Sequence, residues 1–151
     1  MIKAQRGTID ILPSESGKWQ FLEQTAREVS RLHNVSEIRT PIFEATELFA
    51  RSSGESSDVV NKEMYTFEDK GGRSITLRPE GTAGVVRACI EHGLFADTLP
   101  LKLYYIAPVF RYEKPQAGRL REFRQYGVEL FGSNSPKMVA EALEIGKDFL
   151  T

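Results

Sequence analysis

Residues 101–131 decide the fold and read LKLYYIAPVF (101–110), RYEKPQAGRL (111–120) and REFRQYGVELF (121–131). Residues 101–113 and 120–131 are rich in β-branched and aromatic residues, and the segment 114–118 between them contains proline and glycine. Two such runs around a turn-forming segment are typical of a β-hairpin with a longer loop. The sequence therefore predicts two long antiparallel strands.

The second of these strands carries different residue types on its two faces. Alternate residues of a strand share a face, so position numbers alone sort them. The even-numbered face has the core-like residues Tyr126, Val128 and Leu130. The odd-numbered face has a cation, a ring, an amide, a glycine and a carboxylate: Arg121, Phe123, Gln125, Gly127 and Glu129.

The preceding strand adds a second polar pair. Arg111 and Glu113 share a face opposite to that of Phe110 and Tyr112, and would join the odd-numbered face if the strands pair. Guanidinium groups pair with phosphate oxygens, and an aromatic ring stacks on a base. The pattern indicates a nucleotide-binding surface. From pattern alone, a solvated sheet face with cross-strand ion pairs is an equal alternative.

A second candidate segment is LRPEGT at residues 77–82, between an expected strand and an expected helix. A helix N-terminus favours anions, so Glu80 beside it could present a carboxylate to a cationic ligand. The same residue types also make an ordinary turn and helix cap, and the pattern alone favours that interpretation.

The remaining elements are expected to flank these strands. Apolar residues at steps of three and four predict helices over residues 14–33, 82–92 and 136–151. Ser14 and Thr82 are expected caps, and Ser135-Pro136 is expected to open the last helix. Alternating runs at 64–68 and 74–78 predict a second hairpin, and 35–38 a short strand. Residues 51–57 lack apolar side chains and are expected to be a flexible loop. We expect one domain over residues 1–151, of α+β class, with an antiparallel sheet flanked by helices.

Composition excludes several classes of protein. The 151 residues carry 20 Lys and Arg against 21 Asp and Glu, for a net charge of -1. No run reaches the roughly 18 apolar residues of a membrane span, and no secretory signal is visible, so we expect a cytoplasmic protein. One cysteine, Cys89, and two histidines argue against disulfides and a structural zinc site.

Four ordered segments resemble the class II aminoacyl-tRNA synthetases and, among them, the histidyl-tRNA synthetases. They are RGTIDILP (6–13), RTPIFE (39–44, similar to motif 1), LRPEGT (77–82) and the region 110–129, similar to motif 2. Several segments in order are far more specific than one short motif.

The resemblance implies a reaction and a set of roles. Histidine would be activated by ATP, with Mg²⁺, to histidyl-adenylate and then transferred to the acceptor end of tRNA(His). Arg111 would be the catalytic residue, holding both the α-phosphate and the histidine carboxylate. The other implied ATP-binding residues are Glu113, Arg119, Arg121 and Phe123. The implied histidine-binding residues, besides Arg111, are Glu80, Gly81, Thr82, Gln125 and Glu129.

The resemblance also implies an incomplete class II catalytic fold. The chain would be the N-terminal part of a catalytic domain, without motif 3 and the anticodon-binding domain, and a homodimer through the motif 1 region. We expect weak activity, or none, from such a fragment of a histidine–tRNA ligase. One alternative is a non-catalytic, histidine-sensing paralogue of the ATP phosphoribosyltransferase regulatory type; another is a plain module that binds RNA or itself. Retention of Arg111, Glu113, Arg121 and Phe123 favours the enzyme.

Overall fold

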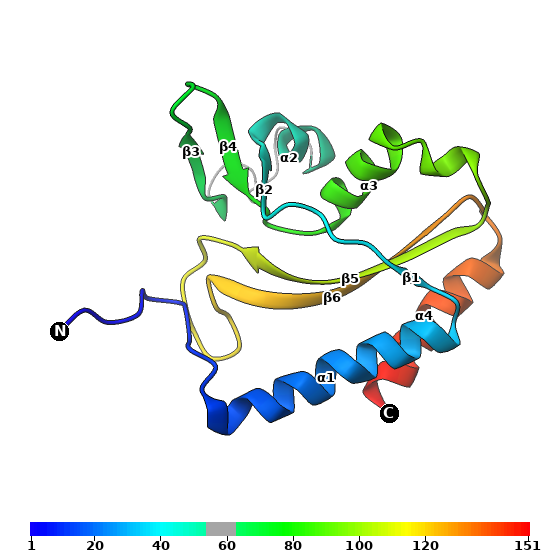
Figure 1. Cartoon of the computed structure of the whole chain (residues 1–151), viewed down its shortest axis with the longest axis horizontal. Helices are drawn as coiled ribbons and strands as arrows, with labels where there is room; N and C mark the ends of the chain where they lie inside the picture. Colours follow the sequence, from blue (N-terminus) through cyan, green and yellow to red (C-terminus); the bar gives the residue numbers. More distant parts are fainter. Residues whose placement is uncertain (54–62) are drawn as a thin grey trace. The chain divides into compact units, whose positions relative to one another are not determined.

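The computed structural model describes residues 1–53 and 63–151 and shows the expected α+β class (Figure 1). The helices are α1 (Pro13–Leu32), α2 (Thr46–Ser53), α3 (Thr82–Glu91), the 3-10 helix η2 (Leu94–Ala96) and α4 (Pro136–Leu150). The strands are β1 (Ser36–Glu37), β2 (Phe43–Ala45), β3 (Thr66–Glu68), β4 (Ser74–Leu77), β5 (Leu101–Phe110) and β6 (Glu122–Phe131). The three predicted long helices are confirmed.

The chain divides into two compact units. The first unit comprises Met1–Asp10, Thr40–Ala88 and Ala107–Gln125, and the second comprises Ile11–Arg39, Cys89–Ile106 and Tyr126–Thr151. The nucleotide-binding candidates 111–125 therefore belong to the first unit, whereas Glu129 belongs to the second.

The main sheet has the order β1-β5-β6. Strand β1 pairs in parallel with β5, with Ser36 opposite Leu103, so this sheet is mixed and not wholly antiparallel as predicted. Strand β5 ends at Phe110 and not at Glu113, because the Tyr112 N–H turns to the carbonyl of Glu63 at 2.6 Å. Strand β6 begins at Glu122, since the Arg121 N–H donates to the carbonyl of Gly7 at 2.7 Å.

A small antiparallel sheet, β2-β4-β3, lies in the first unit. Its β3–β4 hairpin is the predicted one, and Asp69 holds the turn by accepting from the Gly71 and Arg73 N–H groups at 2.8 and 3.0 Å. These bonds and the Arg73 guanidinium lower the pKa of the Asp69 carboxyl. Of the loop expected over residues 51–57, residues 51–53 belong to α2, and 54–57 lie outside the described residues.

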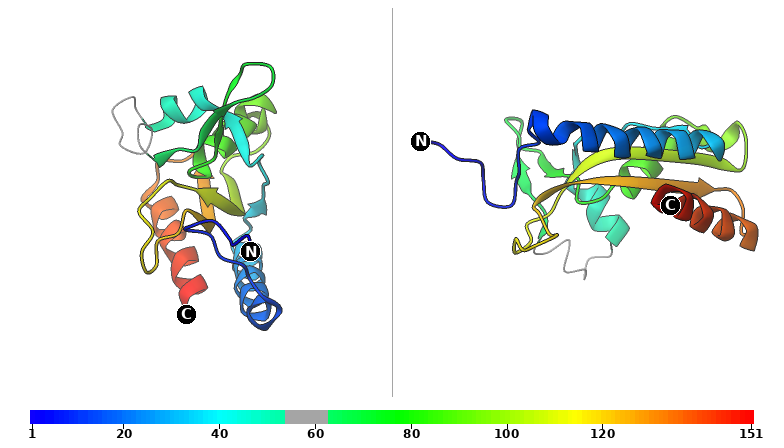
Figure 2. Two further views of the ribbon diagram at one scale, coloured as in Figure 1. Left: turned by 90° about the vertical axis from the view of Figure 1, so that its left-hand side faces the viewer. Right: turned by 90° about the horizontal axis from the view of Figure 1, so that it is seen from below.

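The second unit has a core made by α1, α4 and the sheet. Helices α1 and α4 pack side by side (Figure 2). Buried residues from four segments form one cluster, against which Tyr126 and Val128 pack: Val29, Val35, Tyr104 and Ile145. The prediction that the even-numbered face of β6 is core-like is thus confirmed for Tyr126 and Val128.

Helix boundaries confirm some expected caps and correct others. Helix α4 opens at Ser135-Pro136 as predicted, and Ser135 caps it by accepting from the Lys137 N–H at 3.3 Å. Leu12, not Ser14, is the N-cap of α1, because Pro13 already occupies the first helical turn. Gly93, just past α3, has a positive φ of 66°, a conformation common at helix C-termini.

No helix in residues 1–53 or 63–151 is both long and apolar enough to cross a membrane.

Candidate functional site

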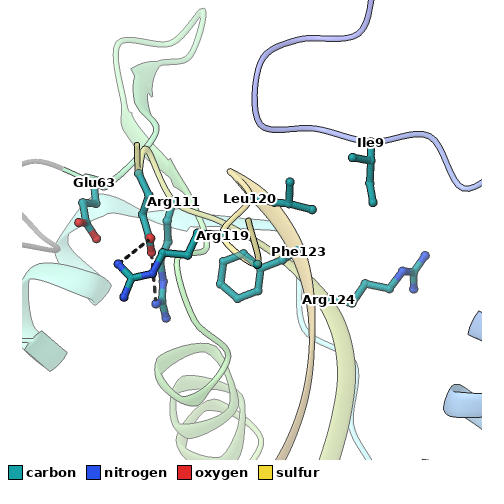
Figure 3. Close-up of a pocket in the computed structure, with 9 residues that line it drawn as sticks. Ile9, Glu63, Arg111, Arg119, Leu120, Phe123 and Arg124 are labelled. Carbon is teal, nitrogen blue, oxygen red and sulfur yellow. Dashed lines mark ion pairs between the residues drawn. The ribbon is translucent and has the colours of Figure 1, made fainter. Parts of the chain in front are cut away.

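The end of β5 and the start of β6 bring the predicted nucleotide-binding residues to one pocket of the first unit. This pocket has a volume of about 810 Å³. Of the sequence-predicted residues it contains four: Arg111, Glu113, Arg119 and Phe123. Figure 3 shows the guanidinium groups of Arg111 and Arg119 near one carboxylate, with the Phe123 ring beside them. Strand parity grouped Arg111 and Glu113 with the Phe123 ring, and all three side chains line this pocket.

Charge in the pocket is mixed, with a cationic excess. The Glu113 carboxylate lies 3.9 Å from Nη1 of Arg111 and 3.7 Å from Nη1 of Arg119. Charge-assisted hydrogen bonds are shorter, at about 2.7–2.9 Å, so these ion pairs are loose. The Arg111 guanidinium also lies 5.3 Å from the Phe123 ring centroid. A flat ring beside two loosely paired guanidinium groups suits an aromatic anion such as a nucleotide.

Arg111 is oriented by the LRPEGT turn. Its Nε donates to the carbonyl of Pro79 at 2.8 Å. The turn is itself fixed by Arg78, which is 5% exposed and whose guanidinium donates to the carbonyls of Pro108, Thr40 and Pro41 at 2.7, 3.0 and 3.3 Å. One buried cation thus ties the motif 1-like segment and β5 to the turn that holds Arg111.

Glu80 in the same turn presents a fixed carboxylate. It accepts from the N–H groups of Thr82 and Ala83, at 2.5 and 3.0 Å, and so caps α3 itself. Thr82, expected to be the cap, is the first residue of the helix. Gly81 lies between the two. The turn is therefore both a helix cap and a site where a carboxylate is held at a helix N-terminus.

Gln125, on the odd-numbered face of β6, has a buried Oε1 without a hydrogen-bond partner among the described residues. Leaving a buried acceptor unsatisfied costs roughly 1–3 kcal/mol, so such atoms call for a ligand or an ordered water. This atom supports a polar ligand near the start of β6.

Arg121 is not brought into the 810 Å³ pocket. Its guanidinium stacks on the ring of Tyr112, at 4.0 Å from the centroid, and its Nε donates to the carbonyl of Glu113 at 3.1 Å. Strand parity grouped Arg121 with Phe123, but Arg121 precedes β6, and its side chain packs on Gly7 and stacks on Tyr112 instead. Arg124, on the even-numbered face, lies at the pocket edge and points away from Phe123 in Figure 3.

Sequence reasoning missed several residues that line the pocket, among them Ile9 and Glu63. Ile9 lies within the recognised segment 6–13, which could have indicated it. Glu63 lies just before the run 64–68 that predicts a strand, and no pattern in the sequence marks it.

The second unit holds the remaining candidate, Glu129. Its neighbour two positions back, Gly127, faces the Tyr105 ring so closely that a Cβ would lie 2.2 Å from Cζ of Tyr105. Burial, with the negative charge of Glu129, raises the pKa of the Cys89 thiol. Cys89 is fully buried, as expected of a small core residue.

Three comparisons with known proteins agree. The family model described as histidyl-tRNA synthetase matches residues 7–151. A histidine–tRNA ligase of Halothermothrix orenii is 62% identical over 149 residues, which are 99% of this chain and 36% of that protein. The ligase of Moorella thermoacetica is 64% identical over 146 residues, 97% of this chain and 34% of that protein. The chain thus spans about a third of the length of these curated relatives.

Solved structures show the same fold. The crystal structure of apo histidyl-tRNA synthetase from S. aureus matches 99% of this chain and 34% of its own, with a TM-score of 0.83 and 49% identity. A Bacillus halodurans structure, described as an ATP phosphoribosyltransferase regulatory subunit/histidyl-tRNA synthetase, matches 99% of this chain and 38% of its own, with a TM-score of 0.78 and 25% identity.

Proposed function

Because this chain belongs to the histidyl-tRNA synthetase family, we propose that it is part of a histidine–tRNA ligase, which activates histidine with ATP and transfers it to tRNA(His). Relatives at 62% and 64% identity carry the name histidine–tRNA ligase. The observation that carries the proposal is the pocket that unites Arg111, Glu113, Arg119 and Phe123.

The proposed ATP contacts follow from the chemistry of each side chain. Phe123 stacks on the adenine ring, and Glu113 accepts from the adenine amino group. Arg119, whose side chain is 65% exposed, reaches the outer phosphates or the acceptor end of the tRNA. Arg111 holds the α-phosphate, with its Nε already anchored on Pro79.

Besides Arg111, the residues proposed to contact histidine are those of the LRPEGT turn and of β6. Glu80, with its carboxylate fixed by the α3 N-terminus, binds the ammonium group, beside Gly81 and Thr82. The unpartnered Oε1 of Gln125 supplies a second acceptor. Glu129 faces the imidazole of the substrate. Its carboxylate favours a substrate that can donate a hydrogen bond to it over one that cannot.

The chain's part in the reaction is mainly positioning. An oxygen of the histidine carboxylate attacks the α-phosphorus of ATP, the bond to the bridging oxygen breaks, and pyrophosphate leaves with the electron pair. Arg111 holds both anions and neutralises charge on the crowded phosphorus, so no side chain must gain or lose a proton.

The expected Mg²⁺ has no dedicated site on the described residues, where no group of three or more His, Cys, Asp or Glu side chains could hold a metal. Magnesium generally binds through one or two carboxylates and substrate phosphates. In this proposal Mg²⁺ would be bound as the counter-ion of the ATP phosphates.

We also propose a homodimer formed through the motif 1 region. In the β2-β4-β3 sheet, Phe43 is opposite Leu77, and Phe67 is opposite Ile75, so these four side chains share one face. Phe43 is 54% and Phe67 48% exposed. An apolar sheet face of this kind favours association with a second copy in a closed, two-fold arrangement.

The test is histidine-dependent ATP–pyrophosphate exchange by the purified chain, with Arg111→Ala as the inactivating variant. Arg31→Ala is the matched control, since Arg31 is an exposed cation of α1 that pairs with Glu28 on the same helix. Exchange that requires histidine, disappears with Arg111→Ala and survives Arg31→Ala supports the proposal.

Titrations separate the remaining outcomes. Binding of histidine and ATP without exchange supports a substrate site that is incomplete in this chain. Binding of histidine without ATP favours the histidine-sensing regulatory paralogue, for which the Bacillus halodurans likeness at 25% identity is the supporting observation. Binding of neither contradicts the proposal for this chain.

A further inference from the structure

Tyr112 stands between two pocket residues, Arg111 and Glu113, but its side chain lies elsewhere. It lines a second pocket of the first unit, of about 390 Å³, together with Arg121. Residues 111–113 form a tight turn centred on Tyr112, in which the Glu113 N–H donates to the Arg111 carbonyl at 2.8 Å. Holding the Tyr112 ring in place therefore also holds Arg111 and Glu113, whose side chains line the nucleotide pocket.

Three contacts hold Tyr112. The guanidinium of Arg121 lies over its ring, 4.0 Å from the centroid. The Tyr65 ring meets its edge, with centroids 5.6 Å apart and planes at 77°. Its N–H donates to the carbonyl of Glu63 at 2.6 Å. Tyr112 is nevertheless 53% exposed, so the Arg121 guanidinium covers a ring that would otherwise face solvent.

Arg121 is itself fixed by contacts with three other residues. Its Nε donates to the Glu113 carbonyl at 3.1 Å, and its carbonyl accepts from the Arg111 N–H at 2.9 Å. Its own N–H donates to the carbonyl of Gly7 at 2.7 Å. A Cβ on Gly7, where φ is +85°, would lie 2.7 Å from Cγ of Arg121, so the arginine stem packs directly on this glycine.

We propose that Arg121 is a positioning residue that orients Arg111 and Glu113 through Tyr112, and that it does not contact the nucleotide. The identity of the nucleotide rests on the proposed function. Arg119 differs, because it extends into the pocket and reaches the Glu113 carboxylate. The two arginines of one loop thus have separate tasks, one in the pocket and one behind it.

The test measures amide hydrogen exchange of Arg111, Tyr112 and Glu113 by NMR, without nucleotide, alongside ATP affinity. In Arg121→Leu, we expect these amides to exchange about five- to tenfold faster and ATP to bind more weakly by a similar factor, as for loss of one cation–π contact and one hydrogen bond. Arg119→Leu is the matched control and should weaken ATP binding while leaving the three exchange rates unchanged.

Two further variants separate positioning from charge. Arg121→Lys keeps the positive charge but loses the planar stack, so it should resemble Arg121→Leu in exchange. Tyr112→Phe keeps the ring and should exchange as wild type. Circular dichroism shows whether Arg121→Leu folds. If it does not, the exchange rates of Arg121→Lys and Tyr112→Phe are compared instead.

If the three amides of Arg121→Leu exchange at the wild-type rates, the proposal is overturned, whatever the change in ATP affinity. If Arg121→Leu does not fold, the same result in Arg121→Lys overturns it. ATP affinity that survives Arg121→Lys but falls in Arg121→Leu, with exchange unchanged, would make Arg121 a direct phosphate contact. Failure of the wild-type chain to bind ATP is a different result: it contradicts the proposed function, while the exchange rates still decide whether Arg121 orders residues 111–113.

Discussion

Gln125 keeps an unpaired buried acceptor, a feature that stability alone does not explain. Gln125→Leu removes it, so we expect the free energy of unfolding to stay constant or rise by up to about 1 kcal/mol, while histidine binding weakens. Urea unfolding and histidine titration check the two effects. Gln24→Leu, on the exposed side of α1, is the control for a general gain from added apolar surface. A clear loss of stability in Gln125→Leu would mean that the amide has a structural partner.

The space at Gly127 is too small for any side chain. Gly127→Ala places a methyl group 2.2 Å from Cζ of the buried Tyr105 ring, and we expect it to destabilise by about 1–3 kcal/mol through overpacking. Gly146→Ala, in α4 of the same unit, meets nothing within 4 Å and should stabilise by about 0.5–1 kcal/mol. Chemical denaturation of both variants measures the contrast. Equal effects would show that the Tyr105 ring moves aside at little cost.

At the scale of the secondary-structure elements, serines near the N-termini of α4 and α1 give a matched pair of variants. Ser135→Ala removes the hydroxyl that accepts from Lys137 and should cost about 1 kcal/mol of unfolding free energy. Ser14→Ala should change little, because Leu12 occupies the N-cap position of α1 and Ser14 lies inside the first helical turn. Thermal or urea unfolding compares them. A larger loss for Ser14→Ala would contradict this assignment of the α1 boundary.

Elements with a sustained period were predictable from the sequence, whereas short ones were not. The period of 3.6 residues marks α1 and α4, and alternation marks β6. Strand β2 has only three residues, too few to show any period, and its pairing with β4 is a tertiary contact.

The site was predictable to the same degree. Alternation grouped Arg111, Glu113 and Phe123, and all three line one pocket, although Arg111 and Glu113 lie beyond the end of β5 at Phe110. It failed at Arg121, where Gly7 and Tyr112, one of them far away in sequence, set the direction of the side chain. The hydrogen bond from the Tyr112 N–H to the Glu63 carbonyl could not be predicted either, because it joins two segments that are distant in sequence.

On the scale of the whole molecule, the exposed sheet face predicts assembly. We expect the chain to be a dimer in sedimentation analysis and Phe43→Asp to shift it to monomer, because the charge enters the apolar face shared with Phe67. Phe21→Asp is the matched control, since Phe21 is 69% exposed on α1, outside this face. A monomeric wild-type chain, or equal dissociation by both variants, would contradict the proposed interface.

The buried Arg78 also has a consequence for the order in which the first unit forms. Its acceptors at Pro108 and Thr40 lie 30 and 38 positions away, on opposite sides of it in the sequence. Contacts of such separation close large loops, which costs chain entropy before they stabilise anything. We therefore expect the turn that holds Arg111 and Glu80 to reach its final geometry late in folding, and a nascent chain without Pro108 to lack part of that support. Recovery of ligand binding during refolding is then a kinetic reporter of the completed first unit, slower than the appearance of helical signal from α1.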